Sequence, residues 1–174
     1  SFRNLSFFES YFSNFIEGTE FEVEEAADIV FHHKLMPNRS EDAHDIVGTY
    51  KIVSNKKDMQ TTPHSPEQFI TLLKKRHQFL MSVRHDKNPG EFKKIANRAG
   101  DTVFVRPELV IGTLEKSFEL YKTLESGLKR AIFTMFCVSE IHPFDDGNGR
   151  IARIMMNAEL AAVNHCRIII PTVY

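Results

Sequence analysis

The sequence predicts a mainly α-helical single domain over residues 1–174, with one β-hairpin. Apolar side chains recur at three- and four-residue spacing along most of the chain, as in amphipathic helices. Residues 91–105 depart from this period, because short β-prone segments flank a turn there. A chain of 174 residues without an internal repeat is long enough to bury one core without disulfides.

Three helices are predicted in the N-terminal third of the chain. Residues 2–16 place aromatic side chains at helical spacing, and Gly18 ends the pattern. Thr19 is the expected N-cap of the next helix, which has acidic first turns suited to the positive end of a helix dipole and which Pro37 closes. Ser40, followed by two acidic residues, opens the third helix.

A polar, proline-bearing segment at residues 55–66 is predicted to be a loop. The clearest helix of the sequence follows it, with Ser65 as N-cap, Pro66 in the first turn and Gln68 completing a capping box. The expected buried stripe of this helix consists of Phe69, Leu72, Leu73, Phe79, Leu80 and Val83.

The hairpin is predicted from residues 91–96 and 102–105, which flank the turn sequence NRAGD. Pro107 ends the hairpin and starts a helix that Gly127 breaks. Residues 128–141 are apolar on most sides, which predicts a buried helix. A last helix, rich in alanine and methionine, resumes after a glycine-rich bend.

The charges of the chain nearly balance, with 22 basic and 23 acidic residues and a net charge of -1. This balance indicates no general attraction to nucleic acid or membranes. Cys137 and Cys166 have no metal-binding spacing, so reduced thiols in a cytoplasmic protein are expected rather than a disulfide or zinc site. We expect no signal peptide or membrane span, and an apolar end at residues 167–174 that stops inside a longer protein.

The most informative stretch is residues 142–150, HPFDDGNGR, between two predicted helices. The first turn of a helix leaves backbone N–H groups unpaired and carries partial positive charge. Gly147 and Gly149 let such amides converge on an anion, because no Cβ blocks the approach. Asn148 between them tolerates a left-handed backbone or donates its own side-chain amide. The bend therefore predicts an anion-binding site.

Charged side chains around the bend indicate which anion binds. Arg150 and Arg153 are three positions apart on the new helix, hence on one face, as suits a polyphosphate. Asp146 offers the hard oxygen ligand that Mg²⁺ takes together with phosphate oxygens. His142 titrates near neutral pH and can accept a proton. The set predicts phosphoryl-type chemistry, and the attacking hydroxyl is expected from the substrate because the bend holds no serine or cysteine.

Each part of the bend has a simpler interpretation when taken alone. Gly-Asn-Gly is usually a turn or helix C-cap, a lone histidine before proline is more often structural, and two arginines can form a solvated helix face. Residues 147–152 also fit the dinucleotide pattern G-x-G-x-x-A, which needs a preceding strand and an acidic residue about 20 positions on. Position 167 is Arg and a helix is expected before the bend, so we reject that interpretation. The sequence contains no Walker A loop.

As a unit, residues 142–153 resemble the signature loop of Fic-domain proteins at every defining position. The resemblance implies a helical domain that transfers AMP from ATP, with Mg²⁺ and release of pyrophosphate, to a Ser, Thr or Tyr hydroxyl of a target protein. The hairpin at residues 91–105 takes the place of the family's flap, which pins the target by strand addition. By motif position, the resemblance implies that His142 is the general base, that Asp146 is the magnesium ligand and that Phe144 anchors the loop. It implies nucleotide binding for Gly147, Asn148 and Gly149, the last two in the anion hole. Arg150 is expected to contact the phosphates, and Arg153 the γ-phosphate.

A second motif concerns regulation. SNFIEG, which begins at Ser13, resembles the family's inhibitory motif S/T-x-x-x-E-G/N and includes Glu17 and Gly18. The resemblance implies an N-terminal inhibitory helix region, residues 1–18, whose Glu17 pairs with Arg153 and takes the place of the γ-phosphate. The alternative is that Glu17 is a solvated residue at the end of a helix.

Three functions are compatible with the sequence. The first is an autoinhibited protein adenylyltransferase. The second is a hydrolase that removes AMP from a modified protein, with Glu17 orienting water. The third is a non-catalytic module whose bend binds a phosphorylated partner, and the presence of His142 argues against it. The Phe-rich N-terminal helix is expected to pack in the core, with a homodimer contact as the alternative.

Overall fold

The structure is a computed structural model of the chain and describes residues 2–171. The described part contains eight helices and one antiparallel two-stranded hairpin, which confirms the predicted fold class. No described helix combines the length and apolar character that crossing a bilayer requires. The α-helices are α1 (Phe2–Phe15), α2 (Val23–His32), α3 (Ser40–Val53), α4 (Lys56–Met59), α5 (Pro66–Leu80), α6 (Val110–Tyr121), α7 (Leu128–Ile141) and α8 (Asn148–Ala162); the strands are β1 (Arg98–Ala99) and β2 (Thr102–Val103), and short 3-10 helices cover Pro37–Arg39, His85–Lys87 and Pro107–Leu109.

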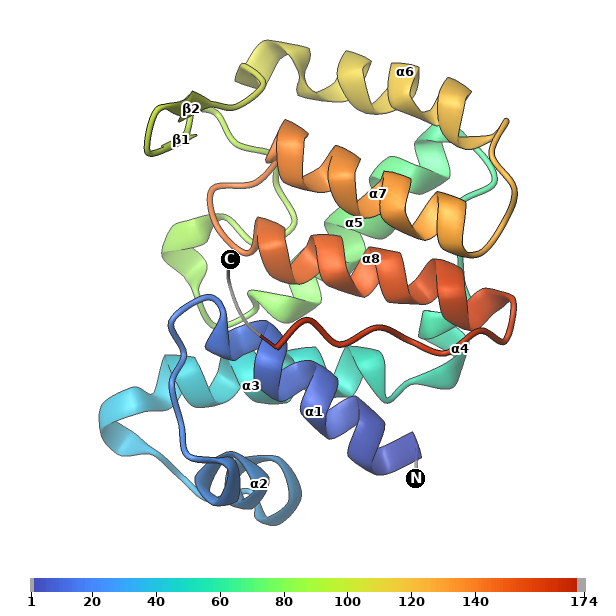
Figure 1. Cartoon of the computed structure of the whole chain (residues 1–174). Helices are drawn as coiled ribbons and strands as arrows, with labels where there is room; N and C mark the ends of the chain where they lie inside the picture. Colours follow the sequence, from blue (N-terminus) through green and yellow to red (C-terminus); the bar gives the residue numbers. More distant parts are fainter. Residues whose placement is uncertain (1, 172–174) are drawn as a thin grey trace.

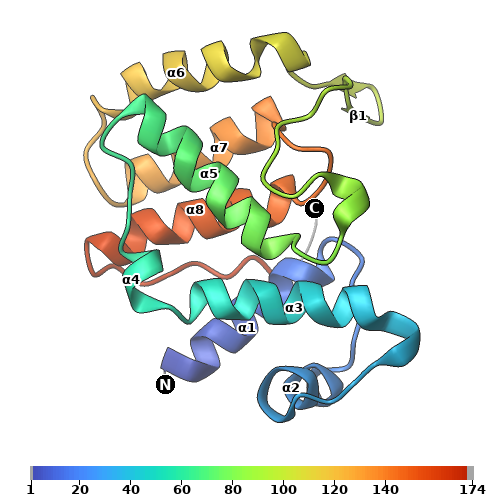
Figure 2. The same cartoon turned by 180° about the vertical axis from the view of Figure 1, so that it is seen from behind.

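The helices are stacked in layers around α7 and α8 (Figure 1). Helix α6 covers one side of α7, and α1 and α3 lie on the far side of α8. Seen from behind, α5 crosses the back of this pair (Figure 2). The hairpin projects at the end of the molecule where α7 turns into α8. The bend that links α7 to α8 is therefore bordered by the hairpin and by the end of α1.

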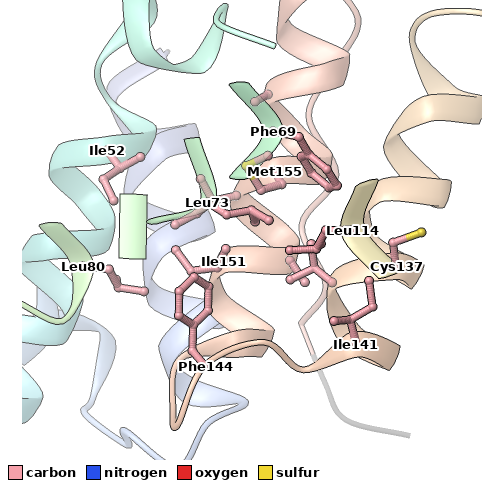
Figure 3. Packing of buried hydrophobic residues seen from close by; sticks show 14 of the residues in the cluster. Ile52, Phe69, Leu73, Leu80, Leu114, Cys137, Ile141, Phe144, Ile151 and Met155 are labelled. Carbon is pink, nitrogen blue, oxygen red and sulfur yellow. The ribbon is translucent and has the colours of Figure 1, made fainter. Parts of the chain in front are cut away.

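The main apolar core fills the space between α5, α6, α7 and α8 (Figure 3). Leu73 of α5, Leu114 of α6 and Val138 of α7 are completely buried, because each lies on the inward stripe of its helix. Phe144 of the bend also reaches into this core and is completely buried. Burial of one phenyl ring contributes about 2 to 3 kcal/mol, so the bend is anchored by hydrophobic packing.

A second apolar cluster joins α1, α2 and α3. Phe7 and Tyr11 of α1 pack against Ile29 of α2 and Ile46 of α3. The Tyr11 hydroxyl donates to the Phe21 carbonyl at 2.9 Å, which satisfies its one polar atom. Helix α1 thus packs in the core through Phe7 and Tyr11, whereas Phe8 and Phe15 of its predicted aromatic stripe are each 38% exposed.

The second helix begins later than predicted. Thr19 is not its N-cap: the Thr19 N–H donates to the Asn14 carbonyl at 3.1 Å and completes the end of α1 instead. Phe21 is buried outside any helix and Glu22 is extended, so α2 starts only at Val23. The helix also ends before Pro37, since His33 adopts a left-handed conformation with φ of 55°.

Three other sequence expectations are wrong in detail. The loop at residues 55–66 contains the short helix α4, which Asn55 caps by accepting a hydrogen bond from the Asp58 N–H at 3.1 Å. Ser65 is the N-cap of α5, as predicted. Of the expected buried stripe, however, Phe79 is 49% exposed and Val83 lies beyond the end of the helix at Leu80. Helix α7 is buried on one side only, because it shows apolar side chains to solvent at every fourth position, namely Leu128, Ile132 and Phe136.

The hairpin lies where the sequence predicts it but is much shorter. Only Arg98–Ala99 and Thr102–Val103 form strands, with Arg98 opposite Val103. Residues 91–96 do not form a strand, because the Lys93 N–H donates at 2.9 Å to the Pro143 carbonyl of the bend rather than to a β partner. Part of the expected hairpin is thus used to hold the bend.

Candidate active site

The bend at residues 142–147 connects α7 to α8. His142 ends α7 in a left-handed conformation, with φ of 51°, and its N–H donates to the Val138 carbonyl at 3.0 Å. Gly147 precedes α8 with φ of 73°, and a Cβ there would lie 3.0 Å from the sulfur of Met81. Glycine is required at this position for both conformation and space. The N–H groups of the first turn of α8, which begins at Asn148, point out of the helix toward the bend.

Phe144 and Asn148 close the bend on itself. The Asn148 side chain accepts from the Phe144 N–H at 2.8 Å and donates to the Phe144 carbonyl at 2.9 Å. The sequence interpretation offered this side-chain amide as a donor to an anion, but it is consumed inside the bend. Only the backbone N–H of Asn148 remains for that purpose. The Phe144 ring, buried as expected, stacks on His77 with centroids 3.7 Å apart.

His77 of α5 is a residue of the site that the sequence analysis missed. Its Nδ1 accepts from the Gly90 N–H at 2.9 Å, so the ring proton lies on Nε2, which donates to the Asp146 carbonyl at 3.0 Å. Burial is the main cause that lowers the pKa of His77 to about 4. The neutral ring therefore holds the bend at physiological pH. No motif spacing could reveal it, because its partners are distant in sequence.

His142 has the geometry of a general base. Its Nδ1 lies 3.2 Å from the Ser139 carbonyl, which can only accept, so Nδ1 carries the proton and Nε2 keeps a free lone pair. The ring stacks on Phe104, just after β2, at 3.9 Å and 8°. Burial, followed by the positive charge of Lys93, lowers the pKa of His142 below its ordinary value. The imidazole is thus held neutral, as a proton acceptor must be.

Asp146 is a half-buried residue of the bend whose carboxylate is still accessible. Its side chain is 41% exposed, and Oδ1 accepts from the Gly147 N–H at 2.6 Å. The described residues include no group of three or more His, Cys, Asp or Glu side chains placed to hold a metal ion. A single exposed carboxylate fits Mg²⁺ that completes its shell with phosphate oxygens and water. Asp145 points elsewhere and accepts from the Asn88 amide at 2.8 Å.

Arg150 is not open to a ligand in the way the sequence suggested. It is 3% exposed, and its Nη1 lies 2.7 Å from the buried carboxylate of Asp45 on α3. Asp45 also binds Arg84 at 2.8 Å, so one carboxylate serves two guanidinium groups. The solvated-face alternative is wrong as well, because both Arg150 and Arg153 are largely covered. Arg150 fastens the start of α8 to α3.

Arg153 binds the end of α1. Its Nη2 lies 2.6 Å from Glu17 Oε1 and donates to the Ser13 carbonyl at 2.8 Å, while its Nε donates to Ser13 Oγ at 2.9 Å. A Cβ added at Gly149 would overlap the Glu17 carboxylate. Glu17 therefore lies directly over the first turn of α8, where the helix dipole favours an anion. Gly18, with φ of 87°, turns the chain away immediately afterwards.

The structure thus brings the predicted residues of the bend and of the SNFIEG segment into one site. His142, Asp146 and Gly149 lie on the bend and the first turn of α8, and Glu17 reaches the same turn from α1. A cavity of about 370 Å³ between α3 and α5 lies away from this site and is lined by Lys51, Phe79 and Ser82 among others. The chemistry-bearing residues are at the bend and not in that cavity.

Comparison with known proteins addresses the family and the fold of the chain. The family model described as Fic/DOC family matches residues 70–160. A Fic domain containing signaling protein from Bacteroides thetaiotaomicron has a TM-score of 0.81 at 19% identity, covering 96% of this chain and 66% of that one. Fic-1 from C. elegans has a TM-score of 0.76 at 21% identity, covering 97% of this chain and 52% of that one. A Fic family protein from Desulfovibrio desulfuricans has a TM-score of 0.74 at 18% identity, covering 91% of this chain and 48% of that one.

These likenesses establish a shared fold. The chain spans about half to two thirds of the length of the solved structures it resembles. A comparison with curated proteins finds no match.

Proposed function

Because this chain belongs to the Fic/DOC family, we propose that it is an autoinhibited protein adenylyltransferase. The reaction transfers AMP from ATP to the hydroxyl of a Ser, Thr or Tyr residue in a target protein and releases pyrophosphate. The observation that carries the proposal is the convergence of a neutral His142 and an exposed Asp146 on a helix start that already holds the carboxylate of Glu17. A site that accommodates one anion at this helix start can accommodate a phosphate there.

In the proposed reaction, Nε2 of His142 accepts the proton of the target hydroxyl. The hydroxyl oxygen bonds to the α-phosphorus as the bond from that phosphorus to the oxygen bridging to the β-phosphorus breaks, and that oxygen leaves with pyrophosphate. The Nδ1 contact with Ser139 keeps the tautomer that leaves Nε2 free. A positioned base of this kind contributes about 10²- to 10⁴-fold to a rate.

The phosphates are proposed to lie across the first turn of α8. The backbone N–H groups of Asn148 and Gly149 face the anion, and Arg153 binds the γ-phosphate once Glu17 has left. Mg²⁺ supplies neutralisation of phosphate charge when bound, and Asp146 is the residue that would hold it. Arg150, fixed by Asp45, keeps its positive charge close to this turn while it positions the helix.

Inhibition follows from competition for Arg153. With Glu17 at 2.6 Å and two contacts from Ser13, the guanidinium has its donors directed to α1 rather than to ATP. The two residues are partly buried, so solvent screens their attraction less than at an open surface. ATP must displace the carboxylate before it can adopt a productive pose.

The test is transfer of labelled AMP by wild-type protein, Glu17→Gly and Glu17→Gln. Loss of a hydrogen bond between charged groups changes an equilibrium constant by about 10- to 100-fold. Both variants should therefore label themselves or a lysate protein about 10 to 100 times faster than wild type. Glu20→Gln is the matched control, because Glu20 is an exposed acid three residues further on. The proposal is wrong if folded Glu17→Gly neither binds ATP nor transfers AMP.

A hydrolase that removes AMP from a modified protein is the second candidate. The observation in its favour is that Glu17 acts on the same centre as His142, since its negative charge opposes the burial that lowers the pKa of the imidazole. Incubating an AMP-modified protein with wild type and Glu17→Gly separates the two functions. Removal of AMP by wild type, abolished in Glu17→Gly, supports the hydrolase.

The non-catalytic module remains as a control hypothesis. An anion-binding bend needs no base, so His142→Ala should leave the cellular activity of a pure binding module unchanged. Loss of AMP transfer with retained ATP binding in His142→Ala supports the enzyme.

A further inference from the structure

Lys93 and Asn97 of the hairpin region bind four consecutive carbonyl groups around His142, three through their side chains and one through the backbone N–H of Lys93. The acceptors are the last residue of α7 and the first three residues of the bend. The bonds are Lys93 Nζ to the Ile141 carbonyl (3.2 Å), Asn97 Nδ2 to the His142 carbonyl (3.4 Å), the Lys93 N–H to the Pro143 carbonyl (2.9 Å), and Asn97 Nδ2 to the Phe144 carbonyl (3.0 Å).

The two side chains also bind each other. Lys93 is only 3% exposed, and its ammonium donates to Asn97 Oδ1 at 2.6 Å. Burying a charge is costly unless it is hydrogen-bonded, and both observed acceptors reduce this cost. The Ile141 carbonyl is one of the unpaired groups at the C-terminus of α7, where the helix dipole favours a cation. These contacts offset part of the effect of burial, which lowers the pKa of Lys93 below its ordinary value.

The same pair connects the bend to the hairpin. The Asn97 carbonyl accepts from the Phe104 N–H at 3.2 Å, and the Phe104 ring stacks on the imidazole of His142. The backbone of His142 is therefore held by Asn97, which precedes β1, and its ring is held by Phe104, which follows β2. Its left-handed conformation is unfavourable for a non-glycine residue and persists only where surrounding contacts fix it.

We propose that Lys93 and Asn97 are positioning residues for the proposed AMP transfer: they hold His142 in its left-handed conformation with the ring against Phe104, so that Nε2 stays directed to the target hydroxyl. The hairpin is then part of the catalytic apparatus and sets the orientation of the base. This role rests on the proposed function, but the position and titration of His142 can be measured without it.

The ammonium of Lys93 has a second effect on the same ring. The groups that act on His142 are Lys93 from the hairpin region, Glu17 from the end of α1 and Asp146 from the bend. Burial and Lys93 lower the pKa of His142, whereas the hydrogen bond to Ser139 and the two carboxylates raise it. Removal of the Lys93 charge stabilises the protonated ring, so the pKa rises and the base form is reached only at higher pH.

The experiment places Lys93→Met, Lys93→Arg and Asn97→Asp in the Glu17→Gly background. Misplacement of a base by about 1 Å costs about 100-fold, so kcat should fall by about that factor while KM for ATP changes less than about threefold. In Lys93→Met the acidic limb of the rate profile should also move to higher pH. Lys93→Arg retains the charge and should keep the limb in place while kcat falls. Lys94→Met is the matched control, since Lys94 is exposed and adjacent.

A second measurement is independent of activity. The ring protons of His142 are followed by NMR against pH in wild type, Lys93→Met and Lys94→Met, with thermal unfolding as the check that each variant is folded. A raised pKa in Lys93→Met alone supports the proposal. Folded Lys93→Met that transfers AMP at the rate of Lys94→Met and titrates like wild type overturns it. If no variant transfers AMP, the proposed function fails and the titration still decides the role of Lys93.

Discussion

At the scale of single residues, His77 joins three parts of the site through one imidazole. Its two ring nitrogens bind the Gly90 N–H and the Asp146 carbonyl, and its face covers Phe144. Protonation of Nδ1 would turn an acceptor into a donor that faces the Gly90 N–H. The contact requires the neutral ring, and for this reason the bend should be sensitive to acid.

The predicted consequence is a pH-dependent contribution of His77 to stability. The pKa of His77 is about 4 in the folded chain and about 6.5 when unfolded, so the unfolded chain binds the proton first as pH falls. The contribution is complete above about pH 6.5 and is lost toward pH 4. The difference in unfolding free energy between wild type and His77→Gln should shrink by about 3 kcal/mol between pH 7 and pH 4.

Urea titrations of both proteins at several pH values measure this difference. Glu9, whose pKa burial raises to about 7, titrates in the same range but is present in both proteins and cancels. Parallel stability curves for the two proteins would show that His77 does not carry the effect.

At the scale of elements, the segment after α8 fastens α1 to the rest of the fold. Arg167 lies 2.9 Å from Glu9 of α1, and Asn157 of α8 donates to the same carboxylate at 2.9 Å. Asn157 also exchanges two hydrogen bonds with the backbone of Ile168. This segment runs back along α8 beside α1 (Figure 1). Helix α1, and with it Glu17, is held by a buried polar cluster as well as by apolar contacts.

Arg167→Met should loosen this attachment. The change removes the cation beside Glu9, whose pKa is already raised to about 7, so Glu9 becomes protonated at neutral pH and the ion pair is lost. We expect the unfolding free energy to fall by at most about 3 kcal/mol. A less firmly held α1 should also release Glu17 more often, so AMP transfer is expected to rise even as stability falls. Urea denaturation and labelling measure the two effects. The double variant Glu9→Gln/Arg167→Met, which removes both charges, should recover part of the lost stability.

At the scale of the whole molecule, the SNFIEG segment is continuous with the structural core. Phe7 and Tyr11 belong to the same apolar cluster as Ile29 and Ile46, so α1 cannot leave without exposing that cluster. Activation by dissociation of α1 is therefore costly. Displacement of Glu17 alone breaks one ion pair and leaves the packing of α1 intact.

Two changes distinguish these routes. Deletion of residues 1–18 removes two buried aromatic side chains and should lower the unfolding free energy by at least about 3 kcal/mol. Glu17→Gly should activate transfer while it changes stability by less than about 1 kcal/mol. Thermal unfolding of the two proteins gives the comparison. If the protein without residues 1–18 is as stable as wild type, α1 can leave the domain without loss of stability.

Local signals account for the parts of the fold that the sequence predicted well. Ser65 caps α5, Ser40 begins α3, and α8 starts directly after Gly147, as the pattern of caps and glycines indicates. These features depend on residues within one or two turns of each other. The bend was predictable for the same reason, because all of its defining residues lie within a short stretch of chain.

Contacts between distant segments account for the errors. Arg150 was expected to face a phosphate, but Asp45 of α3 binds it inside the protein, and neither residue has a spacing that reveals the other. The side-chain amide of Asn148 was one predicted donor to an anion, but it closes the bend on Phe144 instead, which leaves only the backbone N–H of Asn148 for an anion. His77 and Lys93 escaped notice because their roles arise only where α5 and the hairpin meet the bend.

The sequence by itself determined the helical class, the order of the main helices and the candidate chemistry of residues 142–153, because periodicity, caps and short motifs are local properties of the chain. Only the tertiary structure decided which charges are buried, which side chains hold the bend and where Glu17 lies. Those outcomes depend on the cost of removing polar groups from water, and this cost is met by partners that folding brings from far along the chain.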